Sequence, residues 1–389
     1  MIYIHIPFCR SFCTYCDFYS EVAARCRKAE DERKQTSLFT GFGKAVAAEI
    51  KARKDEVSDE VNTLYIGGGT PSVLPLSVYE TILDALRDSG HGGPYQEFTV
   101  EVNPDDIVAN GEAYVEGLLK LGVNRISMGV QSFDDGILRF MNRRHDAATA
   151  RKAYAMLEDA GVGNISIDLI FGLPQLSDGQ WQETLKQTLE ISPKGRLPQH
   201  VSSYQLSVEP GSALASMVEK GLWSEASEEL CERQYGMLCD ALAQAGYNHY
   251  EISNFALPGY EAKHNSAYWR HVPYAGFGPG AHSFRRGQVH GEEVCIRQWN
   301  KPDLAAYIED PTGGVEFEVL TDEQMVMEHI MLALRTSEGV SEEYLRAHCH
   351  ASVPDQALLS GNLVRTSSGM VRIPEDRFFV SDGIICQFV

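Results

Sequence analysis

Short apolar segments alternate with longer amphipathic segments over the first two thirds of the chain. The apolar segments predict strands at 2–6, 61–66, 98–102, 125–130, 165–171 and 201–206. The segments between them predict helices near 40–53, 76–89, 112–121, 146–160 and 179–190. This alternation is typical of strand–helix units around a parallel sheet. We therefore predict an α/β fold built from six such units.

One type of junction recurs along these units. The segments "LLKLGVNRIS", "MLEDAGVGNIS" and "ALAQAGYNHYEIS" each end a helix at a glycine, namely Gly122, Gly161 and Gly246. Glycine suits the residue that closes a helix, because that position often has a left-handed backbone. Any helix-to-strand turn has this composition, but three copies favour a repeated barrel unit. The expected architecture is a partial (β/α)6 barrel.

The character of the chain changes after residue 255. We assign residues 1–255 to the barrel, 256–320 to a connecting segment and 321–389 to a small C-terminal domain. The last part predicts a helix over 322–339, another near 341–349 and a hairpin within "LVRTSSGMVRI". Helices followed by a small hairpin resemble a winged-helix module. A polar stretch at 21–38 lacks apolar periodicity and predicts an exposed excursion or part of a solvated helix.

Composition excludes several classes of protein. The 389 residues include 54 acidic and 34 basic side chains, which gives a net charge of −20. Since no stretch collects Lys and Arg, a nucleic-acid partner is not expected. No apolar run approaches the roughly 20 residues that span a bilayer. The N-terminus lacks an export pattern and most cysteines are scattered, so we expect a soluble protein of the reducing cytoplasm.

Three cysteines stand close together in "YIHIPFCRSFCTYCDFYS", at Cys9, Cys13 and Cys16. They follow the first predicted strand, and the carboxyl ends of barrel strands carry the chemistry in folds of this kind. A zinc site with His5 as the fourth ligand is one alternative, although His5 lies within the strand. A [4Fe-4S] cluster is the other, because three thiolates leave one of its four irons open to a small molecule.

The ends of the later strands carry glycines and polar groups. Gly67, Gly68 and Gly69 follow the second strand in "LYIGGGTPS", without the Lys-Ser/Thr of a phosphate-binding loop. The next strand ends carry Glu101, Gln131, Arg143 and Asp168. Each of these four is equally explained as a helix cap. Because loops at one barrel rim converge, the set predicts a shared ligand.

Together these motifs resemble the oxygen-independent coproporphyrinogen III oxidase group of the radical S-adenosylmethionine (SAM) family. The matching segments, in order, are "YIHIPFCRSFCTYCDF", "GGGTPS", "EVNPD", "NRISMGVQSF" and "IDLIFGLP". The resemblance implies a radical SAM partial barrel with a small C-terminal domain, a three-cysteine [4Fe-4S] cluster, bound SAM and an electron donor. It also implies that SAM is contacted by Tyr3, Gly68, Gly69, Thr70, Glu101, Gln131, Arg143 and Asp168.

Two departures within that group resemble its HemW branch, which binds heme. Phe18 occupies the position of a fourth cysteine found in the decarboxylating oxidases, and only eight residues precede Cys9. The segment "HNSAYW" also matches an HNxxYW motif of that branch. By resemblance, His264 contacts heme and Tyr268 and Trp269 form walls; a buried histidine beside an aromatic pair is the alternative reading.

The HemW resemblance implies transfer of heme, or a related porphyrin, to heme-accepting proteins. Contact with a membrane is expected only through a membrane-bound acceptor. The alternative function is oxidative decarboxylation of coproporphyrinogen III in porphyrin biosynthesis. No catalytic residue is assigned in either case.

Overall fold

The structure is a computed structural model that describes residues 1–389 except 23–28, 59, 290 and 351. Its main feature is a nine-stranded sheet of order β11-β1-β4-β5-β6-β7-β8-β10-β9. The six predicted strands form its parallel centre, as β1 (Ile2–Ile6), β4 (Thr63–Gly68), β5 (Glu97–Val102), β6 (Arg125–Gln131), β7 (Ile165–Phe171) and β8 (His200–Gln205). The predicted partial barrel is confirmed.

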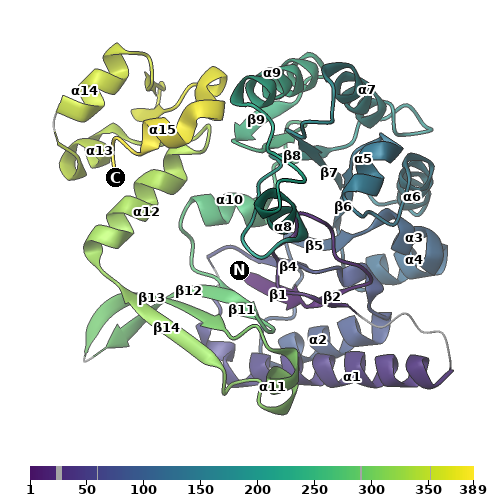
Figure 1. Ribbon diagram of the computed structural model, residues 1–389. Helices are drawn as coiled ribbons and strands as arrows, with labels where there is room; N and C mark the ends of the chain where they lie inside the picture. Colours follow the sequence, from purple (N-terminus) through teal and green to yellow (C-terminus); the bar gives the residue numbers. More distant parts are fainter. Residues whose placement is uncertain (23–28, 59, 290, 351) are drawn as a thin grey trace.

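Helices cover the outer face of this sheet (Figure 1). They are α1 (Ala29–Ala52), α2 (Leu76–Asp88), α3 (Pro104–Asn110), α4 (Glu112–Lys120), α5 (Asp135–Phe140), α6 (Ala147–Asp159), α7 (Asp178–Leu189) and α9 (Glu228–Gln244). The short helix α8 (Ala213–Glu219) lies instead at the cysteine loop, where Leu214 donates its amide to Thr14. The helix predicted at 40–53 starts too late, because α1 begins at Ala29. Among its described side chains, the buried apolar ones begin at Phe39 and continue through Phe42 and Val46, so the polar start of the helix gave no periodic signal.

The strands of the barrel alternate between two environments. In β1, Ile2, Ile4 and Ile6 are buried on the face towards the helices, while the side chains between them point into the barrel. Successive residues of a strand face opposite sides. Each strand therefore contributes one row of apolar side chains towards the helices and one row of side chains towards the barrel interior. The interior rows are largely polar, unlike the branched apolar layers that fill closed barrels. A cavity lies in that interior.

Both edges of the parallel region are extended by later parts of the chain. β10 (Asn254–Ala256) pairs antiparallel with β8 and with β9 (Asn248–Glu251), whereas β11 (Ala275–Phe277) pairs parallel with β1. The chain between them crosses from one edge to the other and contains helix α10 (Lys263–Trp269). Figure 1 shows α10 between the barrel and the C-terminal elements. The segment after residue 255 therefore rejoins the barrel, and the domain boundaries at 255 and 320 stay predictions.

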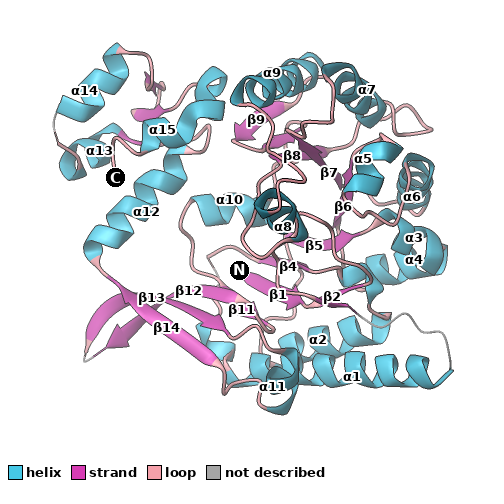
Figure 2. Ribbon diagram, in the orientation of Figure 1, coloured by secondary structure: helices cyan, strands magenta, loops and turns pink. Residues whose placement is uncertain are grey.

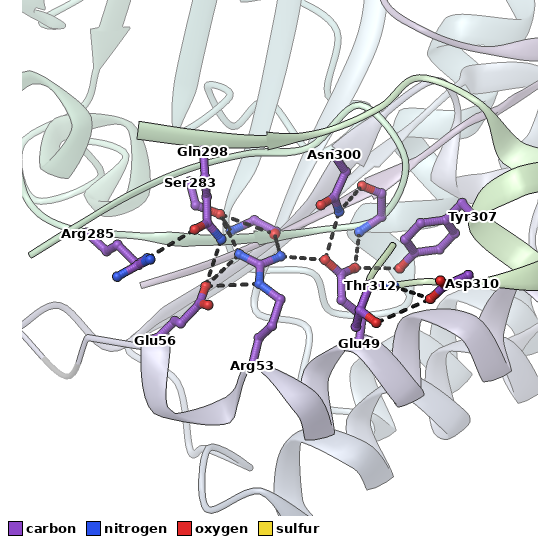
Figure 3. Close-up of polar contacts among 12 residues, drawn as sticks. Glu49, Arg53, Glu56, Ser283, Arg285, Gln298, Asn300, Tyr307, Asp310 and Thr312 are labelled. Carbon is purple, nitrogen blue, oxygen red and sulfur yellow. Dashed lines mark hydrogen bonds and ion pairs between the residues drawn. The ribbon is translucent and has the colours of Figure 1, made fainter. Parts of the chain in front are cut away.

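A second, antiparallel sheet was not predicted from the sequence. It consists of β12 (His282–Val289), β13 (Glu292–Asn300) and β14 (Val315–Leu320), with α11 (Leu304–Glu309) between the last two (Figure 2). Figure 3 shows how buried polar side chains attach it to α1. Arg53 forms ion pairs with Glu49 and Glu56 and donates to Ser283 at 3.0 Å. Glu49 in turn accepts from Asn300 at 2.7 Å.

The C-terminal part contains the predicted helices and hairpin. Its helices are α12 (Asp322–Leu334), α13 (Glu342–His348), α14 (Ser352–Leu359) and α15 (Ser381–Ile385). Its sheet has the order β15-β17-β16, where β16 (Val364–Arg365) and β17 (Met370–Arg372) form the hairpin and β15 (Val340–Ser341) pairs with β17. A bridge between Glu251 and Thr336 joins this part to the edge strand β9.

The remaining elements are short. β2 (Phe8–Cys9) pairs with β3 (Glu21–Val22), and 3-10 turns occur at Lys54–Glu56, Pro71–Val73 and Glu375–Val380. Within the described residues, every helix is too short or too polar to cross a membrane.

Candidate functional site

The cysteine loop leaves the carboxyl end of β1 and borders the cavity. Cys9, Cys13 and Cys16 all line this cavity, whose volume is about 500 Å³. The backbone of the loop is tied to later segments, because Thr14 donates from its amide to Met141 and accepts from the amide of Leu214. Burial raises the pKa of Cys9, and it raises that of Cys16 to about 12. The three thiols therefore border one cavity, and a bound metal would have to displace their protons.

His5, the fourth ligand of the alternative zinc site, has no free ring nitrogen. Its Nε2 lies 2.8 Å from the carbonyl oxygen of Tyr19, and its Nδ1 lies 3.0 Å from the hydroxyl of Tyr3. The ring is also buried beneath the loop. This arrangement leaves the three thiols without the protein ligand that a closed tetrahedral site requires.

The glycines after β4 bring that strand against the cysteine loop. A Cβ atom on Gly69 would lie 2.7 Å from the carbonyl oxygen of Phe8, and Gly69 donates its amide to Ile6. Gly68 has a φ of +106°, and a Cβ there would lie 2.6 Å from the ring of His5. By resemblance, Gly68 and Gly69 contact SAM. In this structure their lack of side chains admits the protein's own backbone and ring.

The four polar residues predicted at the strand ends converge on the same cavity. Glu101, Gln131, Arg143 and Asp168 line it together with Gly68, Gly69 and Thr70. Gln131 has a φ of +67°, a left-handed conformation that is uncommon for a residue other than glycine. It directs the chain at the end of β6 around the rim of the cavity.

Hydrogen bonds hold these side chains in place. Glu101 accepts from the hydroxyl of Tyr65 at 2.6 Å and from the amide of Gly68 at 3.1 Å. Asp168 accepts from the hydroxyl of Ser127 at 3.0 Å, and burial raises the pKa of this carboxyl. Arg143 Nη2 donates to the carbonyl oxygen of Gly129 at 2.6 Å, while its Nη1 lies 3.4 Å from the sulfur of Cys13. Arg143 thus links β6 to the cysteine loop.

The protonation of Glu101 gives a testable pH dependence. Burial raises the pKa of Glu101 to about 7, with Tyr65, Asp168 and Arg125 as the ionisable groups around it. A carboxyl in the unfolded chain has a pKa of about 4.3. Folding therefore favours the protonated form, and the stabilisation is complete below about pH 4.3 and is lost as the pH rises through about 7.

We expect Glu101→Gln to remove this part of the pH dependence. In thermal unfolding without SAM, the wild type should lose more stability than this variant between about pH 5 and pH 8. Glu116→Gln, an exposed change on α4, should behave like the wild type. Equal slopes for all three proteins would contradict the assignment.

Four of the predicted residues lie outside the cavity lining. The ring of Tyr3 packs beside that of Tyr65, with 6.1 Å between centroids, below the cavity surface. His264, Tyr268 and Trp269 belong to α10. Of their motif, only Asn265 lines the cavity.

His264 is a buried histidine with both ring nitrogens engaged. Only 1% of its surface is exposed. Its Nδ1 lies 2.9 Å from the hydroxyl of Thr63 and its Nε2 lies 3.1 Å from that of Tyr268. The alternative reading, a buried histidine beside an aromatic pair, describes these contacts. In this conformation, His264 has no free ring nitrogen for the predicted direct contact with heme.

Several cavity residues were missed in the sequence. They are Asn103, Arg125, Ser127, Ser202, Tyr204 and Asn265. A period of two along β6 would have found two of them, since Arg125, Ser127, Gly129 and Gln131 form one interior row. Asn265 belongs to the HNSAYW motif but was given no role, because α10 reaches the barrel only through the return of the chain to β1.

Comparisons with known proteins identify the family of this chain. The family model of the radical SAM superfamily matches residues 3–188. The heme chaperone HemW of Lactococcus lactis is 35% identical over 88% of this chain and 83% of its own length. That of Synechocystis is 33% identical, over 87% of this chain and 78% of its own length.

A solved structure shows the same fold. Coproporphyrinogen III oxidase (HemN) from Escherichia coli aligns with a TM-score of 0.76 over 100% of this chain and 89% of that chain, at 20% identity. At this identity the likeness concerns the fold alone. The motif match and the curated relatives carry the family assignment, and the chain belongs to the HemW family within the radical SAM superfamily.

Proposed function

We propose that this protein is a heme chaperone of the cytoplasm, which binds heme and transfers it to acceptor proteins. The observation that carries this proposal is the similarity to proteins named heme chaperone over more than four fifths of the chain. Phe18, at the position of the fourth cysteine of the decarboxylating oxidases, supports it. Its side chain is 65% exposed at the mouth of the cavity.

Membership of the radical SAM superfamily implies a [4Fe-4S] cluster and SAM as cofactors. The residues present fit them, because three thiols border one cavity and both ring nitrogens of His5, the candidate fourth ligand, are engaged. When bound, the cluster supplies an electron for cleavage of the sulfonium of SAM. We propose that Cys9, Cys13 and Cys16 hold the cluster.

The polar residues of the cavity then have roles toward SAM. We propose that Glu101 accepts hydrogen bonds from its ammonium group or ribose, and that Gln131 and Asp168 bind ribose hydroxyls. We propose that Arg143, whose guanidinium lies at the cysteine loop, binds the carboxylate of SAM. Gly68, Gly69 and Thr70 would shape the edge nearest the cysteines, and Tyr3 would act through Tyr65, which it packs against.

The position of heme has two candidates. Contact with His264, walled by Tyr268 and Trp269, stays a prediction, and it requires Tyr268 to release the Nε2 atom. At the mouth of the cavity, Phe12 and Phe18 are exposed aromatic side chains. Aromatic rings there suit a flat macrocycle, and this arrangement needs no rearrangement of α10.

Heme titration of the anaerobically reconstituted protein tests the proposal. The wild type should develop a Soret band that saturates at one heme per chain. We expect His264→Ala to weaken heme binding. Because both ring nitrogens of His264 are engaged, the imidazole does not ligate the iron and the position of the Soret band should not change. Thr63→Val, which removes a hydrogen bond of the same ring but keeps the imidazole, should give a smaller loss.

Two other outcomes would change the conclusion. A displaced band in His264→Ala alone would show that the imidazole leaves its partners and ligates iron. Heme binding no tighter than to an unrelated acidic protein would rule out the chaperone function.

The partners of this function follow from the same proposal. They are heme or a related porphyrin, heme-accepting proteins and an electron donor for the cluster, with membrane contact only through a membrane-bound acceptor. Nucleic acid is not among them, in keeping with the net charge of −20. Decarboxylation of coproporphyrinogen is the alternative, and anaerobic formation of protoporphyrinogen would establish it.

A further inference from the structure

Two side chains beside the cysteine loop occupy helix-cap positions without capping. Thr70 precedes the 3-10 turn Pro71–Val73, and Asn103 precedes α3. Threonine and asparagine at such positions usually accept a hydrogen bond from a backbone amide of the first turn. Neither side chain does so here. Both line the cavity instead, and the Nδ2 atom of Asn103 lies 3.2 Å from the hydroxyl oxygen of Thr70.

These two residues belong to a chain of hydrogen bonds that ends at a cysteine. Arg143 donates from Nη2 to the Oδ1 atom of Asn103 at 2.6 Å. Asn103 contacts the hydroxyl of Thr70, and that hydroxyl oxygen lies 3.4 Å from the sulfur of Cys9. The Nη1 atom of Arg143 lies 3.4 Å from the sulfur of Cys13. The chain therefore connects the sulfurs of two of the three proposed cluster ligands.

The direction of each hydrogen bond in this chain follows from its donors and acceptors. A guanidinium has donors only, so the atom of Asn103 that faces Arg143 is the oxygen, and the amide nitrogen faces Thr70. Because that nitrogen is a donor, the oxygen of Thr70 accepts from it. The hydroxyl proton of Thr70 is then directed to Cys9. The sulfur of a metal-bound thiolate carries no proton and can only accept.

We propose that Asn103 fixes the hydroxyl of Thr70 as a hydrogen-bond donor to the sulfur of Cys9, and that this bond raises the reduction potential of the cluster. Hydrogen bonds to the sulfurs are among the factors that set such potentials, because they stabilise the reduced, more negative state. Thr70 is only 6% exposed, so water competes little for the bond. The proposal rests on the [4Fe-4S] cluster of the proposed function.

Redox titration of the reconstituted protein, followed by electron paramagnetic resonance of the reduced cluster, tests this bond. Thr70→Val removes the hydroxyl at nearly constant volume. It should lower the equilibrium constant for one-electron reduction about tenfold, which is a shift of about 59 mV to a more negative potential. Thr70→Ser keeps the hydroxyl and should stay near the wild-type potential. Thr188→Val, a buried change on α7 that also removes a hydrogen bond, should leave the potential unchanged.

Asn103→Asp tests the direction of the bonds. Both oxygens of a carboxylate accept, so the hydroxyl of Thr70 should turn from Cys9 towards the new side chain, and the potential should fall. The added negative charge lowers the potential in any background. The part that acts through Thr70 should vanish in the double variant with Thr70→Val. An equal fall in both backgrounds would overturn the role of Asn103.

Iron and sulfide content separates this proposal from the proposed function. A wild type that binds no iron and sulfide would contradict the cluster, and the proposal with it. A loaded Thr70→Val variant with the wild-type potential would overturn only the bond to Cys9. If Thr70→Val binds no cluster, Asn103→Asp remains decisive, because an unchanged potential in that variant would overturn the proposal.

Discussion

Replacing any one of Cys9, Cys13 or Cys16 with Ala is expected to abolish binding of the iron–sulfur cluster. The three thiols border one cavity, and His5 has no free nitrogen that would replace a lost ligand. A cluster held by two thiolates has lost a third of its protein ligands. Iron and sulfide analysis after anaerobic reconstitution should fall from about four iron atoms per chain to less than one.

The control is a cysteine elsewhere in the fold. Cys295 lies on β13, outside the cavity lining, and Cys295→Ala should retain the wild-type iron content. Equal loss of iron in Cys295→Ala would show that the ligand set is different. A stoichiometric zinc ion in the wild type, with no sulfide, would contradict the cluster itself.

Arg53→Ala is expected to destabilise the protein by about 3–5 kcal/mol, the typical cost of removing one partner of a buried ion pair. Glu49 would remain fully buried with its cation gone, although it still accepts hydrogen bonds from Tyr307 at 2.5 Å and Asn300 at 2.7 Å. The bond from Arg53 to Gly276 of β11 would also be lost, as would the bond to Ser283, which attaches the second sheet to α1 (Figure 3). Chemical denaturation measures the change.

An exposed ion pair between α1 and α2 provides the comparison. Lys51 is exposed and lies 3.4 Å from Asp88, so Lys51→Ala should change the free energy of unfolding by less than about 1 kcal/mol. Replacing both Glu49 and Arg53 with apolar residues, as in Glu49→Leu with Arg53→Met, should recover much of the stability. A loss in Arg53→Ala no larger than that in Lys51→Ala would show that the pair is effectively solvated.

The strands of the barrel were predictable because each has a local pattern. β1 and β7 were placed at their observed bounds, since apolar residues alternate or run continuously in them. The antiparallel sheet of β12 to β14 was missed. In β14 only Leu320 is fully buried, and Phe317 is largely exposed. Because the strand has no buried apolar face, its sequence lacks the alternation of apolar and polar residues that predicts a strand.

The sequence by itself determined the spacing of the three cysteines and the interior rows of the strands, because local backbone geometry decides which residues share a face. It also carried the motifs that place the chain in its family. The tertiary structure alone decided the partners of each polar group. His264 meets Thr63 across 201 residues of chain. Arg125 has no ion pair with any described residue, because contacts between distant segments depend on how the whole barrel packs.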